Sequence, residues 1–113
     1  MVDERRKVPR YLAEVSAQIS HAQSDSGAKV IVEILSVQGA CVRGHDLPEA
    51  GRKCRLTLEW QNERIQAEAE VAWKSHQGMA GLKFFSLDEK SIESLRELLA
   101  TLRLQPLTPG KVE

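Results

Sequence analysis

Hydrophobic and polar residues alternate along much of the first 85 residues of the chain. Alternation at every second position is typical of strands that bury one face. Residues 61–63 (Gln-Asn-Glu) separate the two longest alternating segments, which should therefore form a hairpin. Six strands are predicted, at residues 11–19, 29–35, 40–44, 54–60, 65–74 and 80–85.

After residue 85 the spacing of apolar residues changes from two to three and four. Ser86 and Glu89 have the spacing of a capping box, which predicts a helix start. Pro106 and Pro109 are expected to end it. The apolar stripe of this helix comprises Ile92, Leu95, Leu98, Leu99 and Leu102. We therefore predict a helix within residues 86–104, followed by an unstructured tail, 105–113.

Six strands and one amphipathic helix predict a mostly β fold, a small six-stranded antiparallel barrel with a C-terminal α-helix. The helix should either plug one end of the barrel or pack on its flank. A chain of 113 residues is long enough for one domain and too short for two. We expect a single domain over residues 1–104, with an arm at 1–10, a barrel at 11–85 and the helix at 86–104.

Composition narrows the classes of function. The 16 Lys and Arg balance 16 Asp and Glu, and only five aromatic residues occur (Trp 2, Phe 2, Tyr 1), which argues against a small barrel that binds nucleic acid. The apolar runs are far shorter than the roughly 20 residues that span a bilayer. The first residues lack the layout of a secretory signal, so we expect a cytoplasmic protein.

Little in the sequence indicates catalysis or a metal cofactor. The three histidines, His21, His45 and His76, stand singly in predicted loops without metal-ligand spacing, and we expect them at the surface. No phosphate-binding Gly-rich loop or nucleophile elbow is present, so the protein is not expected to be an enzyme.

Four further residues are interpreted as core. Cys41 and Cys54 each lie in an apolar, strand-like stretch and are expected to be buried thiols. Trp60 and Trp73 are expected on the inward faces of the predicted hairpin.

A cluster of positive charge precedes the first predicted strand. Arg6 and Arg10 are separated by three residues, and Pro9 stiffens the segment. Guanidinium groups pair bidentately with phosphate or a guanine edge, so two of them on one arm could clamp a nucleotide. A charged, solvated chain end is the alternative interpretation, and on this stretch alone we favour it.

A second motif changes that balance. Ser36 stands three residues before Gly39 in the turn "LSVQGA", between the second and third predicted strands. An Arg-x-x-x-Arg arm followed by such a Ser-x-x-Gly turn resembles the PilZ domain family of bacterial cyclic di-GMP receptors. The stretch "EVAWKSHQGMAGLKFF" is also similar to the long Trp-containing strand and short Gly-Leu-x-Phe strand of that family.

The resemblance implies a ligand and its contacts. Arg6 and Arg10, helped by Arg5, would wrap over cyclic di-GMP and contact guanine and phosphate. Ser36 and Gly39 would hold the phosphate-ribose ring and let the ligand lie close to the barrel. Ligand binding would order the arm and reposition a neighbouring domain or a partner, for instance a protein of motility, pilus or exopolysaccharide machinery.

One position departs from the family pattern. Ile34 stands two residues before Ser36, where PilZ domains usually have Asp or Asn, which accepts hydrogen bonds from guanine. An unpaired guanine N–H should cost about 1–3 kcal/mol, or roughly one to two decades of affinity. Ile34 either continues the apolar face of Val30 and Val32 into the core or forms part of an exposed apolar strip, which would favour a protein partner. The chain is thus either a cyclic di-GMP receptor or a degenerate PilZ-fold adaptor that acts through protein contacts alone.

Overall fold

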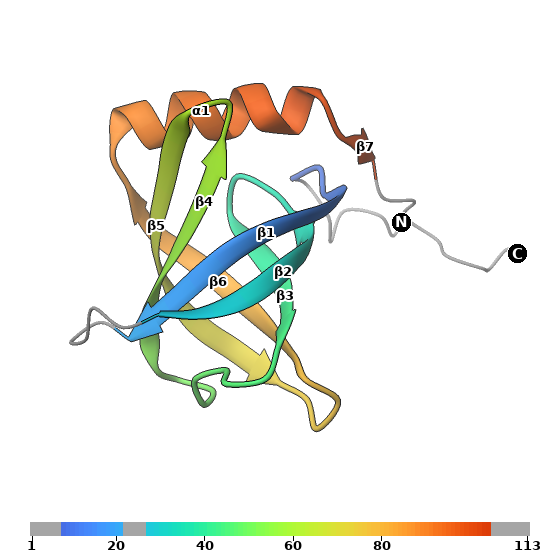
Figure 1. Ribbon diagram of the computed structural model, residues 1–113, viewed down its shortest axis with the longest axis vertical. Coiled ribbons are helices and arrows are strands. Elements are labelled where there is room, and N and C mark those ends of the chain that lie inside the picture. Colours follow the sequence, from blue (N-terminus) through green and yellow to red (C-terminus); the bar gives the residue numbers. More distant parts are fainter. Residues whose placement is uncertain (1–7, 22–26, 105–113) are drawn as a thin grey trace, which may run out of the picture.

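The computed structural model describes residues 8–21 and 27–104, and within them the six predicted strands occur in the predicted order. They form a closed antiparallel barrel in the order β2-β3-β6-β5-β4-β1, which the β1–β2 pairing completes (Figure 1). The predicted fold class is therefore confirmed. The strands are β1 (Tyr11–His21), β2 (Gly27–Leu35), β3 (Gly39–Gly44), β4 (Lys53–Trp60), β5 (Glu63–Lys74) and β6 (Met79–Leu87).

The core of the barrel follows the alternation of the sequence where the strand pairing is regular. Strands β4 and β5 form the predicted hairpin, whose turn residues Gln61 and Asn62 both have positive φ, 52° and 65°. Two such residues match the right-handed twist of a tight hairpin. The largest fully buried side chains include Leu35, Leu56, Leu58, Ile65, Leu95 and Leu98.

Helix α1 (Glu89–Ala100) lies across one end of the barrel, as Figure 1 shows, so of the two predicted placements the plug is correct. Its own residues Leu95, Leu98 and Leu99 are buried against the barrel core. The backbone N–H of Gln66 in β5 donates to Ser91 Oγ at 3.1 Å and ties the helix to the strand.

Both predicted helix boundaries are wrong. The N-cap is Asp88, whose Oδ1 accepts a 2.7 Å hydrogen bond from the Ser91 backbone N–H, whereas Ser86 is still part of β6. The helix ends at Ala100 rather than at residue 104, and β7 (Arg103–Leu104) then pairs with Tyr11 and Leu12 of β1. The apolar spacing extends past the helix because Leu102, two residues after its last residue, still packs against the core, so the sequence alone did not show where the helix ends.

Register shifts interrupt the barrel at several points. They occur between Leu12 and Val15 in β1, between Val32 and Ile34 in β2 and between Val71 and Trp73 in β5. An extra residue in one strand inverts which side chains point outward beyond it. These bulges determine which residues lie on the outer wall of the barrel.

Candidate functional site

A cavity of about 600 Å³ opens on the outer wall of the barrel, beside the turn that joins β2 and β3. Its size falls within the range of small-molecule sites. We call it the outer cavity. It is lined by Arg10, Ile34, Ser36, Gln38, Gly39, Ala40, Cys41, Ala72, Trp73, Gly81, Leu82, Lys83 and Phe84. The structure thus brings Arg10 of the arm together with Ile34, Ser36 and Gly39 of the β2–β3 segment, all of which the sequence singled out.

The Ser36 hydroxyl shapes the turn at the edge of the outer cavity. Its Oγ accepts hydrogen bonds from the backbone N–H groups of Gln38 (3.0 Å) and Gly39 (3.2 Å) and donates to the Gly39 carbonyl at 3.4 Å. Ser36 is only 7% exposed. A hydroxyl has one donor and two acceptor sites, so all its capacity is used inside the turn. Ser36 therefore positions the backbone of the turn beside the cavity.

Gly39 allows the turn to approach β6 closely. A Cβ at this position would lie 2.2 Å from the carbonyl oxygen of Leu82, which is backbone and cannot move aside. The N–H of Phe84 donates to the Gln38 carbonyl at 2.8 Å and holds the turn against the same strand. A glycine at this position therefore fixes one wall of the cavity.

Ile34 points outward, toward the cavity, and not into the core. Val30 and Val32 are buried at 3% and 0% exposure, but the register shift after Val32 places Leu35 inside and Ile34 outside. Of the two interpretations of Ile34, the structure therefore favours the outer-wall position.

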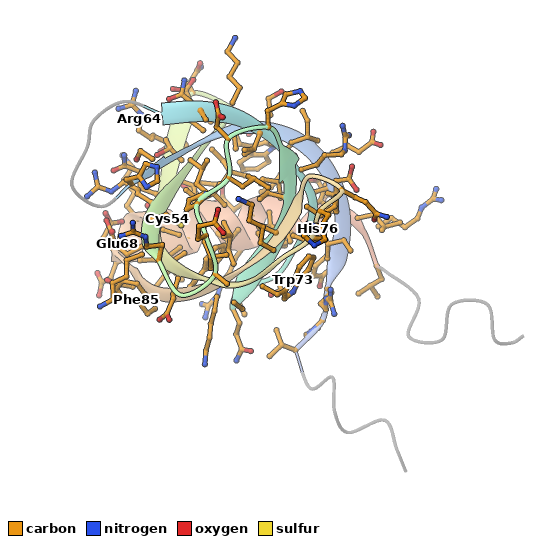
Figure 2. All side chains as sticks on the ribbon, turned by 90° about the horizontal axis from the view of Figure 1, so that it is seen from below. Cys54, Arg64, Glu68, Trp73, His76 and Phe85 are labelled. Atoms are coloured by element: carbon orange, nitrogen blue, oxygen red, sulfur yellow. The ribbon has the colours of Figure 1, made fainter. Side chains whose placement is uncertain are left out.

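Trp73 is part of the same wall, so the prediction that it faces inward is wrong. Its side chain is 47% exposed because the bulge after Val71 turns it outward, and Figure 2 shows it at the outside of the ring of strands. The indole lies over Gly81, where an added Cβ would be 2.2 Å from the indole nitrogen. Trp60 is half-buried and packs against the core.

The two cysteines differ in their surroundings, and both are free thiols. Cys54 is 0% exposed inside the barrel, as predicted, and burial together with the nearby Glu68 raises its pKa to about 11. Cys41 lines the outer cavity and is only half-buried, so its assignment to the core is wrong. Its neighbour Val42 fills the inward position instead. Burial, then the charge of Glu33, raises the pKa of Cys41, and Arg10 opposes this shift.

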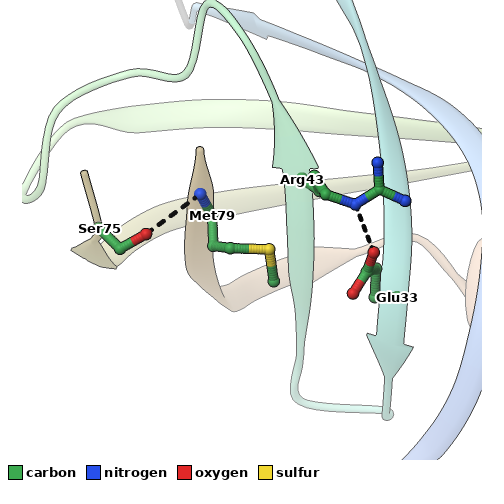
Figure 3. A network of polar contacts seen from close by, with 4 residues as sticks. All are labelled: Glu33, Arg43, Ser75 and Met79. Atoms are coloured by element: carbon green, nitrogen blue, oxygen red, sulfur yellow. Dashed lines mark hydrogen bonds and ion pairs between the residues drawn. The ribbon is translucent and has the colours of Figure 1, made fainter. Parts of the chain in front are cut away.

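The charged side chains that line the outer cavity are both cationic, Arg10 and Lys83. The carboxylate of Glu33 lies near the site but binds Arg43 Nε across β2 and β3, as Figure 3 shows. Such a lining favours an anionic ligand, because no carboxylate of the described part of the cavity neutralises the two cations.

The remaining sequence predictions concern residues outside the lining of the outer cavity. Arg5 and Arg6 are outside the described residues, so the structure places only Arg10 of the predicted clamp. His21, His45 and His76 are exposed, as expected. Residues 8–21 and 27–104 contain no cluster of three or more His, Cys, Asp or Glu that could hold a metal ion. No helix in this part of the chain has the length and apolar character needed to cross a bilayer.

Several lining residues were not predicted from the sequence. Trp73 and Cys41 were assigned to the core because uninterrupted alternation would bury them. Gly81 and Lys83 were not singled out, although the Gly-Leu-x-Phe stretch that includes them was noted. A glycine in the strand opposite a tryptophan was the available signal, since it permits a close approach.

Comparison with known proteins agrees with the fold and the motifs. Residues 4–101 match the family model described as PilZ domain. No curated protein matches the chain. Similar solved structures include a PilZ domain of CeSA from a cellulose-synthesizing bacterium and the Bacillus subtilis inhibitor of motility MotI/DgrA.

The two similar structures share the fold at low sequence identity. The CeSA domain is 15% identical with a TM-score of 0.65, and the match covers 81% of this chain and 95% of that one. MotI is 19% identical with a TM-score of 0.69, and the match covers 87% of this chain but 50% of that protein. Because the family model spans most of the sequence, the chain belongs to the PilZ domain family.

Proposed function

We propose that this chain is a cyclic di-GMP receptor and adaptor, which passes the second-messenger signal to a partner protein. The single observation that supports it is that Arg10 lies in one cavity with the Ser36–Gly39 turn. The two cations of the lining, Arg10 and Lys83, suit the phosphates of a cyclic dinucleotide. The Ser36–Gly39 turn, held against β6 by the bond from the Phe84 N–H to the Gln38 carbonyl, forms the wall beside these cations.

The arm supplies the rest of the proposed clamp. Arg10 immediately precedes β1, and Arg6 and Arg5 stand only four and five residues before it in the chain. We propose that Arg6 contacts the ligand together with Arg10 and that Arg5 assists. For Arg5 and Arg6 this proposal depends on the family pattern, since both lie outside the described residues.

The proposed role is binding and not catalysis, in the cytoplasm. PilZ domains are receptor and adaptor modules, and the relative from Bacillus subtilis is named an inhibitor of motility. We propose a protein of motility, pilus or exopolysaccharide machinery as the partner.

Calorimetric titration with cyclic di-GMP tests the proposal. Arg10→Ala should weaken binding by about 10- to 100-fold, because a charge-assisted hydrogen bond is lost. Arg6→Ala should act in the same direction. Arg96→Ala is the matched control, since Arg96 is exposed on helix α1 and outside the cavity lining, and it should leave the affinity unchanged. Absence of binding at high micromolar ligand would rule the receptor function out.

Cys41 provides a second measurement without mutation. It lines the cavity, whereas Cys54 is fully buried, so iodoacetamide should modify Cys41 first. Bound cyclic di-GMP should slow this modification. Equal rates with and without saturating ligand would show that the nucleotide binds elsewhere.

A second candidate function is supported by the outer wall itself. Register pairs connect Leu12 to Ile34, Ile34 to Cys41, Cys41 to Gly81 and Gly81 to Trp73, giving an apolar row across five strands. Leu12 and Trp73 are 41% and 47% exposed. A PilZ-fold adaptor that has lost the nucleotide could dock a protein on this row. Such an adaptor would show no binding in a titration with cyclic di-GMP. The variant Ile34→Asp would then create or strengthen nucleotide binding.

A further inference from the structure

The polar side chains that line the outer cavity are mainly hydrogen-bond donors. The side chains of Arg10, Lys83 and Trp73 can donate hydrogen bonds but cannot accept them. The other apolar members of the lining offer neither donor nor acceptor in their side chains. These are Ile34, Ala40, Ala72, Leu82 and Phe84.

Three acceptor atoms of the turn already take part in hydrogen bonds. Ser36 Oγ accepts from two backbone N–H groups, those of Gln38 and Gly39. The Gly39 carbonyl accepts the Ser36 backbone N–H at 2.9 Å, and the Gln38 carbonyl accepts the Phe84 N–H at 2.8 Å. A ligand donor that approached these oxygens would have to share or displace an existing bond.

Two side chains of the lining could still accept. The Cys41 thiol is a weak acceptor in its neutral form, and its raised pKa keeps it neutral at pH 7. The Gln38 amide has one acceptor oxygen beside two donor hydrogens and is exposed at the turn. Glu33 is not part of the lining, and its Oε2 accepts a hydrogen bond from Arg43 Nε.

We infer that the outer cavity recognises acceptor atoms of a purine and does not read the 2-amino group of guanine. The inference rests on the proposed nucleotide-binding function and specifies its selectivity. Guanine presents O6 and N7 as acceptors, which match the fork of N–H donors on Arg10, while Lys83 remains for a phosphate. Its 2-amino group is a donor, and Ile34 offers it no acceptor. The Gln38 amide oxygen, exposed to solvent at the turn, is the one strong side-chain acceptor left among the described lining residues.

The experiment compares three cyclic dinucleotides by calorimetry on the full chain. Cyclic di-IMP retains O6 and N7 but lacks the 2-amino group, and its Kd should lie within about threefold of that of cyclic di-GMP. Cyclic di-AMP replaces O6 with an amino donor, so it should bind at least about tenfold more weakly.

An acceptor introduced at Ile34 should create the missing selectivity. Ile34→Asp should bind cyclic di-GMP about tenfold more tightly than cyclic di-IMP. Ile31→Asp is the matched control on the same strand, because Ile31 lies outside the outer cavity lining. It should leave the ratio of the two affinities at the wild-type value.

The outcomes separate the two levels of the proposal. Binding of cyclic di-GMP tenfold tighter than cyclic di-IMP by the wild type would overturn the inference while leaving the receptor function intact. If Gln38→Leu abolished that preference, the acceptor would be the Gln38 amide. Binding of cyclic di-AMP as tight as that of cyclic di-GMP would also overturn the inference, since the donors of the cavity would then not distinguish O6 from an amino group. Failure of all three ligands to bind would overturn the proposed function, and the selectivity with it.

Discussion

The β4–β5 hairpin and the outer cavity belong to the same barrel but differ in the regularity of strand register. Along β4 and the first part of β5 each pair of strands is in regular register, and apolar side chains at every second position fill the core. Around the cavity the register shifts three times, and apolar residues such as Ile34 and Trp73 point outward. The regular part contributes stability, whereas the bulged part exposes the groups that can contact a ligand.

Two isoleucines test this difference most directly. Ile65 in the hairpin is 1% exposed, and Ile65→Ala should lower the free energy of unfolding by about 2–5 kcal/mol through lost packing and a cavity. Ile34→Ala on the outer wall should cost about 1 kcal/mol or less. Urea denaturation measures both, and similar losses would show that the cavity wall is part of the core.

Two glycines distinguish backbone contact from side-chain contact at the cavity. Gly39→Ala should cost about 1–3 kcal/mol, because the new methyl group meets the Leu82 carbonyl. Gly81→Ala meets only the Trp73 indole, which can move, so the loss of stability should be smaller while the Trp73 fluorescence changes. A Trp60→Phe background isolates that emission. An unchanged Trp73 signal in Gly81→Ala would contradict the close packing of indole on glycine.

The buried thiol of the regular part predicts a pH dependence. The pKa of Cys54 is raised from 9.0 to about 11 in the folded protein, so folding favours the neutral thiol. Its contribution is fully present well below pH 9 and is lost as the pH rises through 11, on the order of 2–3 kcal/mol. Urea denaturation at pH 8 to 11 measures the loss. Cys54→Ala should flatten this part of the profile, and an unchanged slope would refute the assignment.

The smallest expected effect concerns the start of helix α1. Asp88→Ala removes the side chain that accepts from the Ser91 N–H and should cost about 1 kcal/mol, seen as a lower Tm. Ser86→Ala is the control, because Ser86 is exposed in β6 and does not cap the helix. If Ser86→Ala lowered the Tm more than Asp88→Ala, Ser86 would be the N-cap, as its capping-box spacing with Glu89 predicted.

Local pattern was sufficient for most of the fold. The order of the strands, the hairpin and the helix stripe follow from apolar spacing, which depends on residues close in the chain. The N-cap was misassigned by two residues because Ser86 and Asp88 both precede an acidic or polar first turn. Strand β7 was missed because a two-residue strand has no periodicity of its own.

The candidate site was predicted in part. Arg10, Ser36, Gly39 and Ile34 were found as motifs and meet in one cavity, but their binding roles remain proposals. Cys41 and Trp73 could not have been placed there from alternation. A bulge is an inserted residue in one strand relative to its partner, and a single strand does not reveal it.

The sequence by itself determined which segments become strands and helix, because the spacing of apolar side chains is a local property of the chain. The tertiary structure decided which of those side chains face outward, where the turn of Ser36 and Gly39 meets Arg10, and which cysteine reaches the surface. These outcomes depend on strand register, which is set by how distant segments pair and pack around a common core.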